Sequence, residues 1–258
     1  MEKITNYAVY NNGMRNTIID KMWFLDYISP NISTIIDFGC ADGDLFKEIE
    51  KIYPNKFDYI GIDNDKIMRT RAKANLRFAA ERVDIFESLE DLKLFDLDMS
   101  KCILVMNSII HEIYSYCSYV EIRKIFNQIK NSGIKYIAIR DMHLIQNENE
   151  GWRTLKELPK EYHQKFYETT EYVFHNDFTN QILEFLLKYS YDENWERERK
   201  ERYLWNWEFE LLYTLKNYNL KQSFSFSIPY LENKWKKDLG IEFHYKTHKK
   251  ILLELSTF

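Results

Sequence analysis

Short apolar runs alternate with amphipathic segments through the first 140 residues, and this alternation constrains the fold more than any other feature of the chain. The runs are rich in β-branched residues, as buried strands are, whereas the segments between them repeat apolar residues at helical spacing. Alternating strands and helices form right-handed crossovers and a parallel sheet covered on both faces. The predicted strands are Thr34–Phe38, Phe57–Ile62, Phe78–Val83, Lys101–Met106 and Ile134–Ile139, and the predicted helices are Asp44–Tyr53, Asp65–Asn75 and Val120–Ile129.

The alternation stops after the fifth predicted strand. Residues 145–220 favour helices, which predicts a helical insertion between the fifth and sixth strands, and the charged run 195–202 favours a solvated helix with i, i+4 ion pairs. Strand-like runs return at Ser223–Ile228 and Lys250–Leu255, with Pro229–Leu239 as their connection. We expect a single α/β domain over residues 1–258, built on a doubly wound, mostly parallel seven-stranded sheet. Residues 1–29 form an N-terminal helical segment in this prediction, and the insertion is a lid that sets specificity.

Composition limits the partners and the compartment. The 258 residues carry a formal net charge of −4, whereas dedicated nucleic-acid binders are usually basic. Three cysteines without zinc or redox spacing favour a reducing, cytoplasmic location. The N-terminus lacks the apolar core of a signal peptide, and no apolar stretch is long enough to span a membrane. We therefore expect a cytoplasmic protein without a membrane partner.

The most informative motif is the turn DFGCADG, which follows the first predicted strand. Small residues at Gly39, Ala41 and Gly43 allow the backbone to turn tightly and to approach a ligand closely. A dinucleotide-binding turn needs glycine at position 44, but Asp44 stands there, and its carboxylate and that of Asp42 would repel a pyrophosphate. The turn therefore favours a neutral or cationic ligand and disfavours a nicotinamide oxidoreductase.

A further acid, Asp63, ends the second predicted strand 20 residues after Gly43. An acid at this place commonly accepts hydrogen bonds from both hydroxyls of a ribose. Turn and acid together predict a positively charged nucleoside without phosphate groups.

With these motifs the chain resembles the class I, Rossmann-like S-adenosylmethionine-dependent methyltransferase family. The resemblance rests on residues 37–43, with Ala41 in place of the middle glycine, on Asp63, and on Asp84 with the apolar residues after it. It covers residues 30–140 well and the last two strands loosely. It implies a transferase that uses S-adenosylmethionine.

The resemblance also implies a set of cofactor contacts. Asp84 would bind the adenine amino group, Asn64 and Ile85 would flank the ring, and Asn107 and Ser108 would lie near the methionine end. The cofactor-binding residues expected in this way are Asp37, Gly39, Ala41, Gly43, Asp63, Asn64, Asp84, Ile85, Asn107 and Ser108.

Two residues located after the fourth and fifth strands are the candidate catalytic pair. His111 and Asp141 would converge at the carboxyl edge of the sheet, where a histidine and an acid could deprotonate a hydroxyl or an amine. Together with Glu112 and His143 they could instead bind a divalent cation, but the spacing does not require one, and no metal is predicted.

The residues after the fourth predicted strand narrow the choice of methyl acceptor. The sequence NSII lacks the proline signature of enzymes that methylate exocyclic base nitrogens and the Pro-Cys of cytosine C5 methylation. O- or N-methylation remains, with a small molecule favoured before RNA or protein. Tyr7, Tyr10 and Arg15 could close the site, with Arg15 pairing with the cofactor carboxylate. The alternative is a catalytically silent protein of the same fold that binds the cofactor or a nucleotide.

Overall fold

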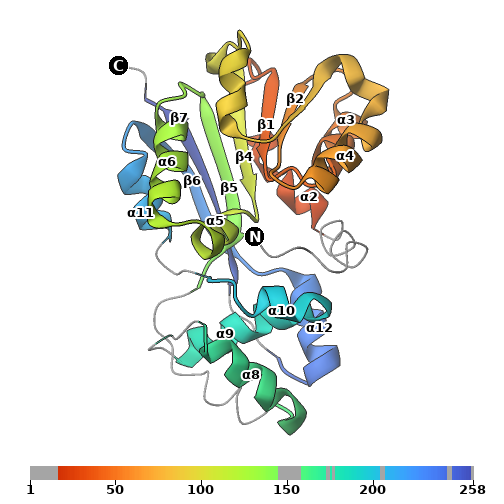
Figure 1. Ribbon diagram of the computed structural model, residues 1–258, viewed down its shortest axis with the longest axis vertical. Coiled ribbons are helices and arrows are strands. Elements are labelled where there is room, and N and C mark those ends of the chain that lie inside the picture. The colour runs from red at the N-terminus through yellow and green to blue at the C-terminus, as the bar shows by residue number, and fades with distance from the viewer. Residues whose placement is uncertain are drawn as a thin grey trace.

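The fold is described by a computed structural model, which covers residues 17–144, 158–172, 175, 178–203, 207–242 and 246–256. Its strands form one sheet in the order β3-β2-β1-β4-β5-β7-β6 (Figure 1). Strands β1 to β5 pair in parallel, and β7 lies antiparallel between β5 and β6. The predicted doubly wound, mostly parallel α/β fold is therefore confirmed. The strands are β1 Thr34–Phe38, β2 Asp58–Ile62, β3 Val83–Phe86, β4 Cys102–Asn107, β5 Tyr136–Met142, β6 Tyr218–Phe226 and β7 His248–Leu255.

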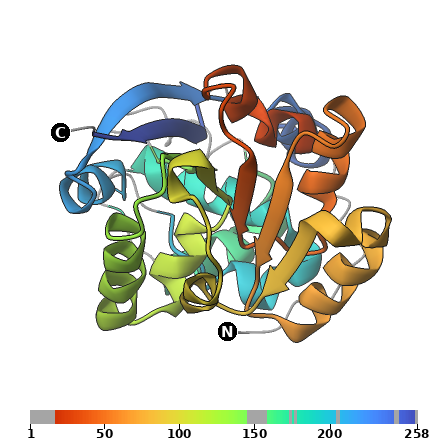
Figure 2. The same cartoon turned by 90° about the horizontal axis from the view of Figure 1, so that it is seen from above.

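Helices cover both faces of this sheet (Figure 2). Successive residues of a strand point to opposite faces, so Ile35 joins a core with α3 and α4, whereas Ile36 joins a second core with α5, α6 and α11. Burial on both sides explains why the central strands are continuous apolar runs. The helices are α2 Ile18–Lys21, α3 Asp44–Ile52, α4 Lys66–Asn75, α5 Ile110–Tyr116, α6 Tyr119–Lys130, α8 His163–Thr170, α9 Phe178–Tyr189, α10 Trp195–Glu198, α11 Trp207–Thr214 and α12 Pro229–Leu239.

The third strand lies later in the chain than predicted. Residues Arg77–Arg82 form a 3₁₀ helix, and β3 begins at Val83 instead of ending there. Pairing with β2 fixes this register, and it turns Ile85 toward Gly61 and the Cys40 side chain. The short apolar run at Phe78 is thus not a strand. Its burial agrees with this, since Phe78 is exposed whereas Ile85 in β3 is buried.

Beyond the carboxyl edge of β5 lies a further group of helices, which we call the outer layer: α8, α9, α10 and α12 (Figure 1). These helices share a third apolar core, in which Phe185 and Leu186 of α9 pack with Trp235 of α12. The indole nitrogen of Trp235 donates to the Leu186 carbonyl and to Ser190 Oγ, both at 2.9 Å. Two stretches far apart in sequence therefore build one layer.

This arrangement corrects two expectations about residues 145–239. The predicted insertion extends to residue 220, but α11 packs Trp207 and Leu211 against the sheet, and β6 begins at Tyr218. Conversely, Pro229–Leu239 is a helix of the outer layer rather than a simple connection, with Pro229 at its first turn and Gly240 as its C-cap.

At the N-terminal end, the described part of the predicted segment 1–29 contains α2 and a 3₁₀ helix, Trp23–Asp26. Tyr7, Tyr10 and Arg15 lie outside the described residues. Among the helices that are described, none is both long enough and apolar enough to cross a membrane.

Candidate functional site

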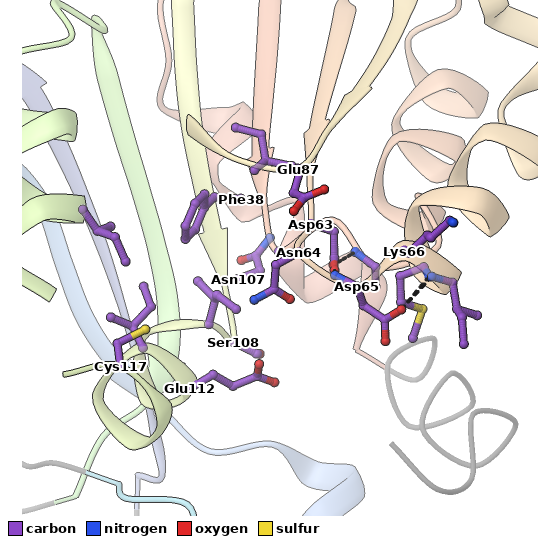
Figure 3. A pocket seen from close by; sticks show the side chains of 18 of the residues that line it. Phe38, Asp63, Asn64, Asp65, Lys66, Glu87, Asn107, Ser108, Glu112 and Cys117 are labelled. Atoms are coloured by element: carbon purple, nitrogen blue, oxygen red, sulfur yellow. Dashed lines mark hydrogen bonds between the residues drawn. The ribbon is translucent and has the colours of Figure 1, made fainter. Parts of the chain in front are cut away.

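A cavity of about 620 Å³ opens at the carboxyl ends of β1, β2 and β4, next to the turn after β1. We call it the main cavity. Figure 3 shows Asp63, Asn64 and Asp65 on one side and Ser108, Glu112 and Cys117 on the other. Its position is the one where doubly wound folds bind ligands. Its walls also include Phe38, Gly39, Ala41, Ile62, Lys66, Ile67, Met68, Glu87, Asn107, Ile109, Ile113, Ile125 and Arg197.

The turn after β1 is held by Asp63. Ala41 has a positive φ of 46°, which is uncommon for a residue with a side chain. Its amide donates to Asp63 Oδ2 at 2.9 Å, and the amide of Asp65 donates to Asp63 Oδ1 at 2.8 Å. Burial raises the pKa of Asp63 to about 6, although both amide bonds favour its charged form. Each carboxylate oxygen keeps a lone pair for a further donor from the cavity.

Glycine is required at the two positions of the turn for different reasons. Gly39 lines the main cavity with φ 83°, and a methyl group there would lie 3.0 Å from the Ile109 side chain. Gly43 is in neither that lining nor that of the small cavity beside it, and it is the N-cap of α3 with φ 81°. An added Cβ at Gly43 would lie 2.8 Å from Leu76 Cδ1. Gly43 therefore allows α3 to approach α4, and its structural position does not place it against a ligand.

The acid after β3 in the cavity wall is Glu87, not Asp84. Asp84 is an exposed residue inside β3, and neither it nor Ile85 lines the cavity. The shift of β3 along the chain causes this difference. Glu87 accepts from Arg69 Nη2 at 2.8 Å, while Asn64 lies in the wall as expected.

At the opposite end of the turn, Asn107 borders both the main cavity and a small cavity of about 30 Å³ that also contains Asp37 and Lys21. Asn107 Nδ2 donates to the Lys21 carbonyl at 3.3 Å, whereas its Oδ1 is buried without a partner among the described residues. Burial raises the pKa of Asp37 to about 6 despite a hydrogen bond from Tyr59. Burial, and then Arg140, lower the pKa of Lys21 to about 7.

His111 and Asp141 meet as predicted, but in an ion pair away from the main cavity. His111 Nδ1 lies 2.6 Å from Asp141 Oδ1, and Nε2 lies 3.4 Å from Glu201 Oε2. Burial opposes its charge, but Asp141 and Glu201 together raise the pKa of His111 to about 10. This pairing favours the imidazolium, which cannot accept a proton, so the role of general base for His111 stays a prediction that the pairing does not favour. Asp141 also accepts from the amides of Ile110 and His111, which fixes the start of α5.

Glu112, the next residue on α5, does face the main cavity. Its carboxylate accepts from Arg197 Nη2 at 2.6 Å, and Arg197 also pairs with Glu198 and Glu201 of the outer layer. Burial raises the pKa of Glu112 against the opposing effect of Arg197. The site therefore offers one partly paired carboxylate beside Ser108.

The comparisons with known proteins agree with this geometry. The profile of a family described as a methyltransferase domain matches residues 31–217. The chain belongs to this methyltransferase domain family. It is an S-adenosylmethionine-dependent methyltransferase of the class I, Rossmann-like type. The predicted enzyme class and cofactor are thereby confirmed.

The individual relatives of this methyltransferase either are distant in sequence or match only part of the chain. The carboxy-S-adenosyl-L-methionine synthase of Nautilia profundicola is 37% identical over 100 residues, which is 39% of this chain and 41% of the synthase. The plantazolicin methyltransferase BamL, solved with SAH, has a TM-score of 0.53 at 11% identity and covers 97% of this chain and 89% of its own. A putative sarcosine dimethylglycine methyltransferase from Galdieria sulphuraria has a TM-score of 0.52 at 9% identity, covering 92% and 86%. The chain thus spans about two fifths of the curated relative, and the solved structures show a shared fold.

A divalent metal would have one place to bind among the described residues of the methyltransferase. Ligand atoms of His111, Glu112 and Glu201 lie within 4.8 Å of one another. The Arg197 guanidinium already pairs with both carboxylates, at 2.6 and 2.9 Å. A metal ion would have to displace this guanidinium, which is already the cation between the two carboxylates.

The sequence alone did not reveal Lys21, Glu87 or Arg197. Glu87 was missed because the third strand was predicted too early in the chain. Arg197, Glu198 and Glu201 recur at helical spacing within a run that favours solvent, yet all three are buried. Their helical spacing was the signal available in the sequence. Because buried charges are rare, the run was instead predicted to be a solvated helix.

Proposed function

We propose that the enzyme transfers a methyl group from S-adenosylmethionine to an oxygen or nitrogen of a small molecule. The observation that carries the proposal is the main cavity, which runs from Asp63 to Ser108 and Glu112 and whose volume is typical of small-ligand sites. Lys66 and Arg197 are the cations in its described wall, and Arg197 is paired with carboxylates. This charge pattern favours a metabolite before RNA. The unpaired thiols Cys40, Cys102 and Cys117 fit the cytoplasmic location that forms part of the proposal.

The residues present fit the cofactor along its whole length. Asp63 would accept from the ribose hydroxyls, and Glu87, with Asn64, lies where the adenine end would extend. At the other end, the unpartnered Asn107 Oδ1 and the Asp37 carboxylate suit an ammonium group, which can only donate. Lys21 lies in the same small cavity, where a carboxylate would stabilise its charged form. Lys21 takes the place in this proposal that we first gave to Arg15.

The cofactor brings a reactive sulfonium methyl group, so the chain mainly has to orient the acceptor and manage its proton. Glu112 is the carboxylate that faces the cavity beside Ser108. Because burial raises its pKa, it can take a proton from an acceptor hydroxyl or ammonium near neutral pH. Arg197 holds Glu112 in place at 2.6 Å.

The test combines binding and turnover. Wild type and Glu112→Gln are titrated with S-adenosylhomocysteine by calorimetry, and each is incubated with methyl-labelled cofactor and a metabolite extract. We expect equal affinity, but labelled product about a hundredfold slower in the variant, as typical for loss of a general base. Binding without any labelled small molecule in the wild type would contradict the proposal.

A further inference from the structure

Another small cavity, separate from the one that Asp37 and Lys21 line, adjoins the main cavity on the side of the outer layer. This side cavity has a volume of about 30 Å³ and shares Ser108, Glu112 and Arg197 with the main cavity. Arg140, at the end of β5, and His248, at the start of β7, form part of its wall. The shared residues place it next to the end of the main cavity that Ser108 and Glu112 form.

Arg140 brings an unused donor to this wall. Its side chain is 2% exposed, Nε donates to Asp20 Oδ2 at 2.6 Å, and Nη1 donates to Ser108 Oγ at 3.2 Å. The guanidinium lies over the Phe226 ring at 5.4 Å, which fixes its plane. Nη2 is buried and has no partner among the described residues. A buried donor without an acceptor is costly, so the geometry calls for an acceptor atom next to Nη2.

The electrostatics around Arg140 favour an anion. The ion pairs of Arg140 and Lys250 both go to Asp20, so two cations share one carboxylate among the described residues. Burial, followed by Arg140, lowers the pKa of Lys21 to about 7 and that of His248 well below its usual value. Because burial, and then Arg140 and the nearby cations, all lower the pKa of His248, His248 is neutral and the potential at this part of the wall is positive.

On the opposite wall, the charges are closer to balance. Arg197 and protonated His111 face Glu112, Glu198 and Glu201. Burial, and next Glu201, raise the pKa of Glu198 well above its usual value.

We propose that the side cavity binds a carboxylate carried by the methyl acceptor, whose body lies in the main cavity. A volume of about 30 Å³ holds a group of a few heavy atoms but not a ring. The planar carboxylate matches an arginine fork. This inference rests on the proposed small-molecule methyl transfer and adds the chemical class of its substrate.

The direct test uses formate as the probe, on the full chain saturated with S-adenosylhomocysteine. The side-chain ¹⁵N signals of Arg140 are followed by NMR during titration with sodium formate, and with sodium chloride at equal ionic strength. We expect formate, and not chloride, to shift the Arg140 signals. No shift specific to formate would mean that a water molecule satisfies Nη2, and it would overturn the proposal.

A variant pair gives the matched control. Arg140→Lys keeps the charge but loses the fork, and we expect it to weaken formate binding at least tenfold while changing S-adenosylhomocysteine affinity less than twofold. Arg82→Lys serves as the control, because Arg82 pairs with Glu50 at a distance from the site. Equal formate affinity in wild type and Arg140→Lys contradicts the inference. The wild-type titration remains decisive if the variant does not fold.

A second arm separates an acceptor carboxylate from a free anion. The wild-type enzyme is given methyl-labelled cofactor and a small-molecule extract, before and after the carboxyl groups of the extract are converted to amides. We expect amidation to abolish the labelling. Labelling that survives amidation overturns the inference but leaves the proposed function standing, whereas failure to bind S-adenosylhomocysteine or to label any small molecule overturns the proposed function itself.

Discussion

At the scale of single residues, Asp63 has two tasks that use the same carboxylate. Its oxygens accept from the amides of Ala41 and Asp65, and they also border the main cavity. One side chain therefore both holds the shape of the turn and carries the proposed contact to a ribose. Asp84, which is similar in type but exposed within β3, has neither task.

We expect Asp63→Asn to weaken S-adenosylhomocysteine binding about ten- to a hundredfold, because hydrogen bonds to a charged group contribute about 1.5–3 kcal/mol. Isothermal titration calorimetry measures this effect. Asp84→Asn is the matched control and should bind like wild type. Equal losses in both variants would show that Asp84 contributes after all, as the family resemblance implied.

His111 gives a prediction for the dependence of stability on pH. Its pKa is raised from 6.5 to about 10 by Asp141 and Glu201. The folded state therefore holds a proton that the unfolded chain releases, so this contribution is complete below pH 6.5 and is lost as the pH rises through 10.

We expect His111→Gln to be less stable than wild type at pH 7, with a difference that shrinks steadily toward pH 10. Urea unfolding of both proteins across this range measures the difference in the free energy of unfolding. A difference that does not change with pH would mean that His111 is neutral in the folded protein.

At the scale of elements, the start of α3 depends on the close approach of α4. Gly43 has a left-handed backbone and, with any Cβ, would press on Leu76. Gly240, the C-cap of α12, has a similar φ of 68° but nothing within 4 Å of an added Cβ. Substitutions at these two glycines therefore separate the cost of backbone strain from the cost of steric contact.

We expect Gly240→Ala to cost about 1 kcal/mol of unfolding free energy, because only the left-handed backbone is penalised. Gly43→Ala should cost about 1–3 kcal/mol more, because overpacking is added to the strain. Thermal or urea unfolding measures both. Equal losses would show that α3 and α4 yield without penalty.

The same scale shows what the sequence could and could not predict. Strands β1, β2, β4 and β5 were found because burial on both faces leaves an apolar run that needs no knowledge of neighbours. The third strand was misplaced because pairing with β2, not local pattern, selects Val83–Phe86.

For the site, the turn and Asp63 follow from local spacing and were predicted. Lys21 reaches the cavity from the N-terminal helix, and Arg197 reaches it from the outer layer. Their positions depend on how separate parts of the chain pack, and no local pattern shows that. Likewise, one of the two carboxylates that raise the pKa of His111 belongs to Glu201, which lies 90 positions later in the chain.

At the scale of the whole molecule, the outer layer is one packed unit made from two stretches of chain. Trp235 of α12 is fully buried and hydrogen-bonds to α9. The layer contacts the sheet domain through Arg197 and Glu112, and through Arg202, whose amide donates to Ser115 Oγ at 2.7 Å.

We expect Trp235→Ala to destabilise this layer by about 3–5 kcal/mol, as other large cavities in cores do. Hydrogen exchange followed by mass spectrometry should show faster exchange in α9 as well as in α12, while β1 is unchanged. Tyr230→Ala, on the exposed side of α12, is the control and should leave exchange unaltered. Faster exchange confined to α12 would show that the two stretches open separately.

The chain passes between the sheet and the outer layer four times: after β5, before α11, after β6 and before β7. An outer layer that is joined to the sheet by four connections cannot rotate about a single hinge. Any movement of the outer layer away from the sheet would therefore have to involve all four connections together.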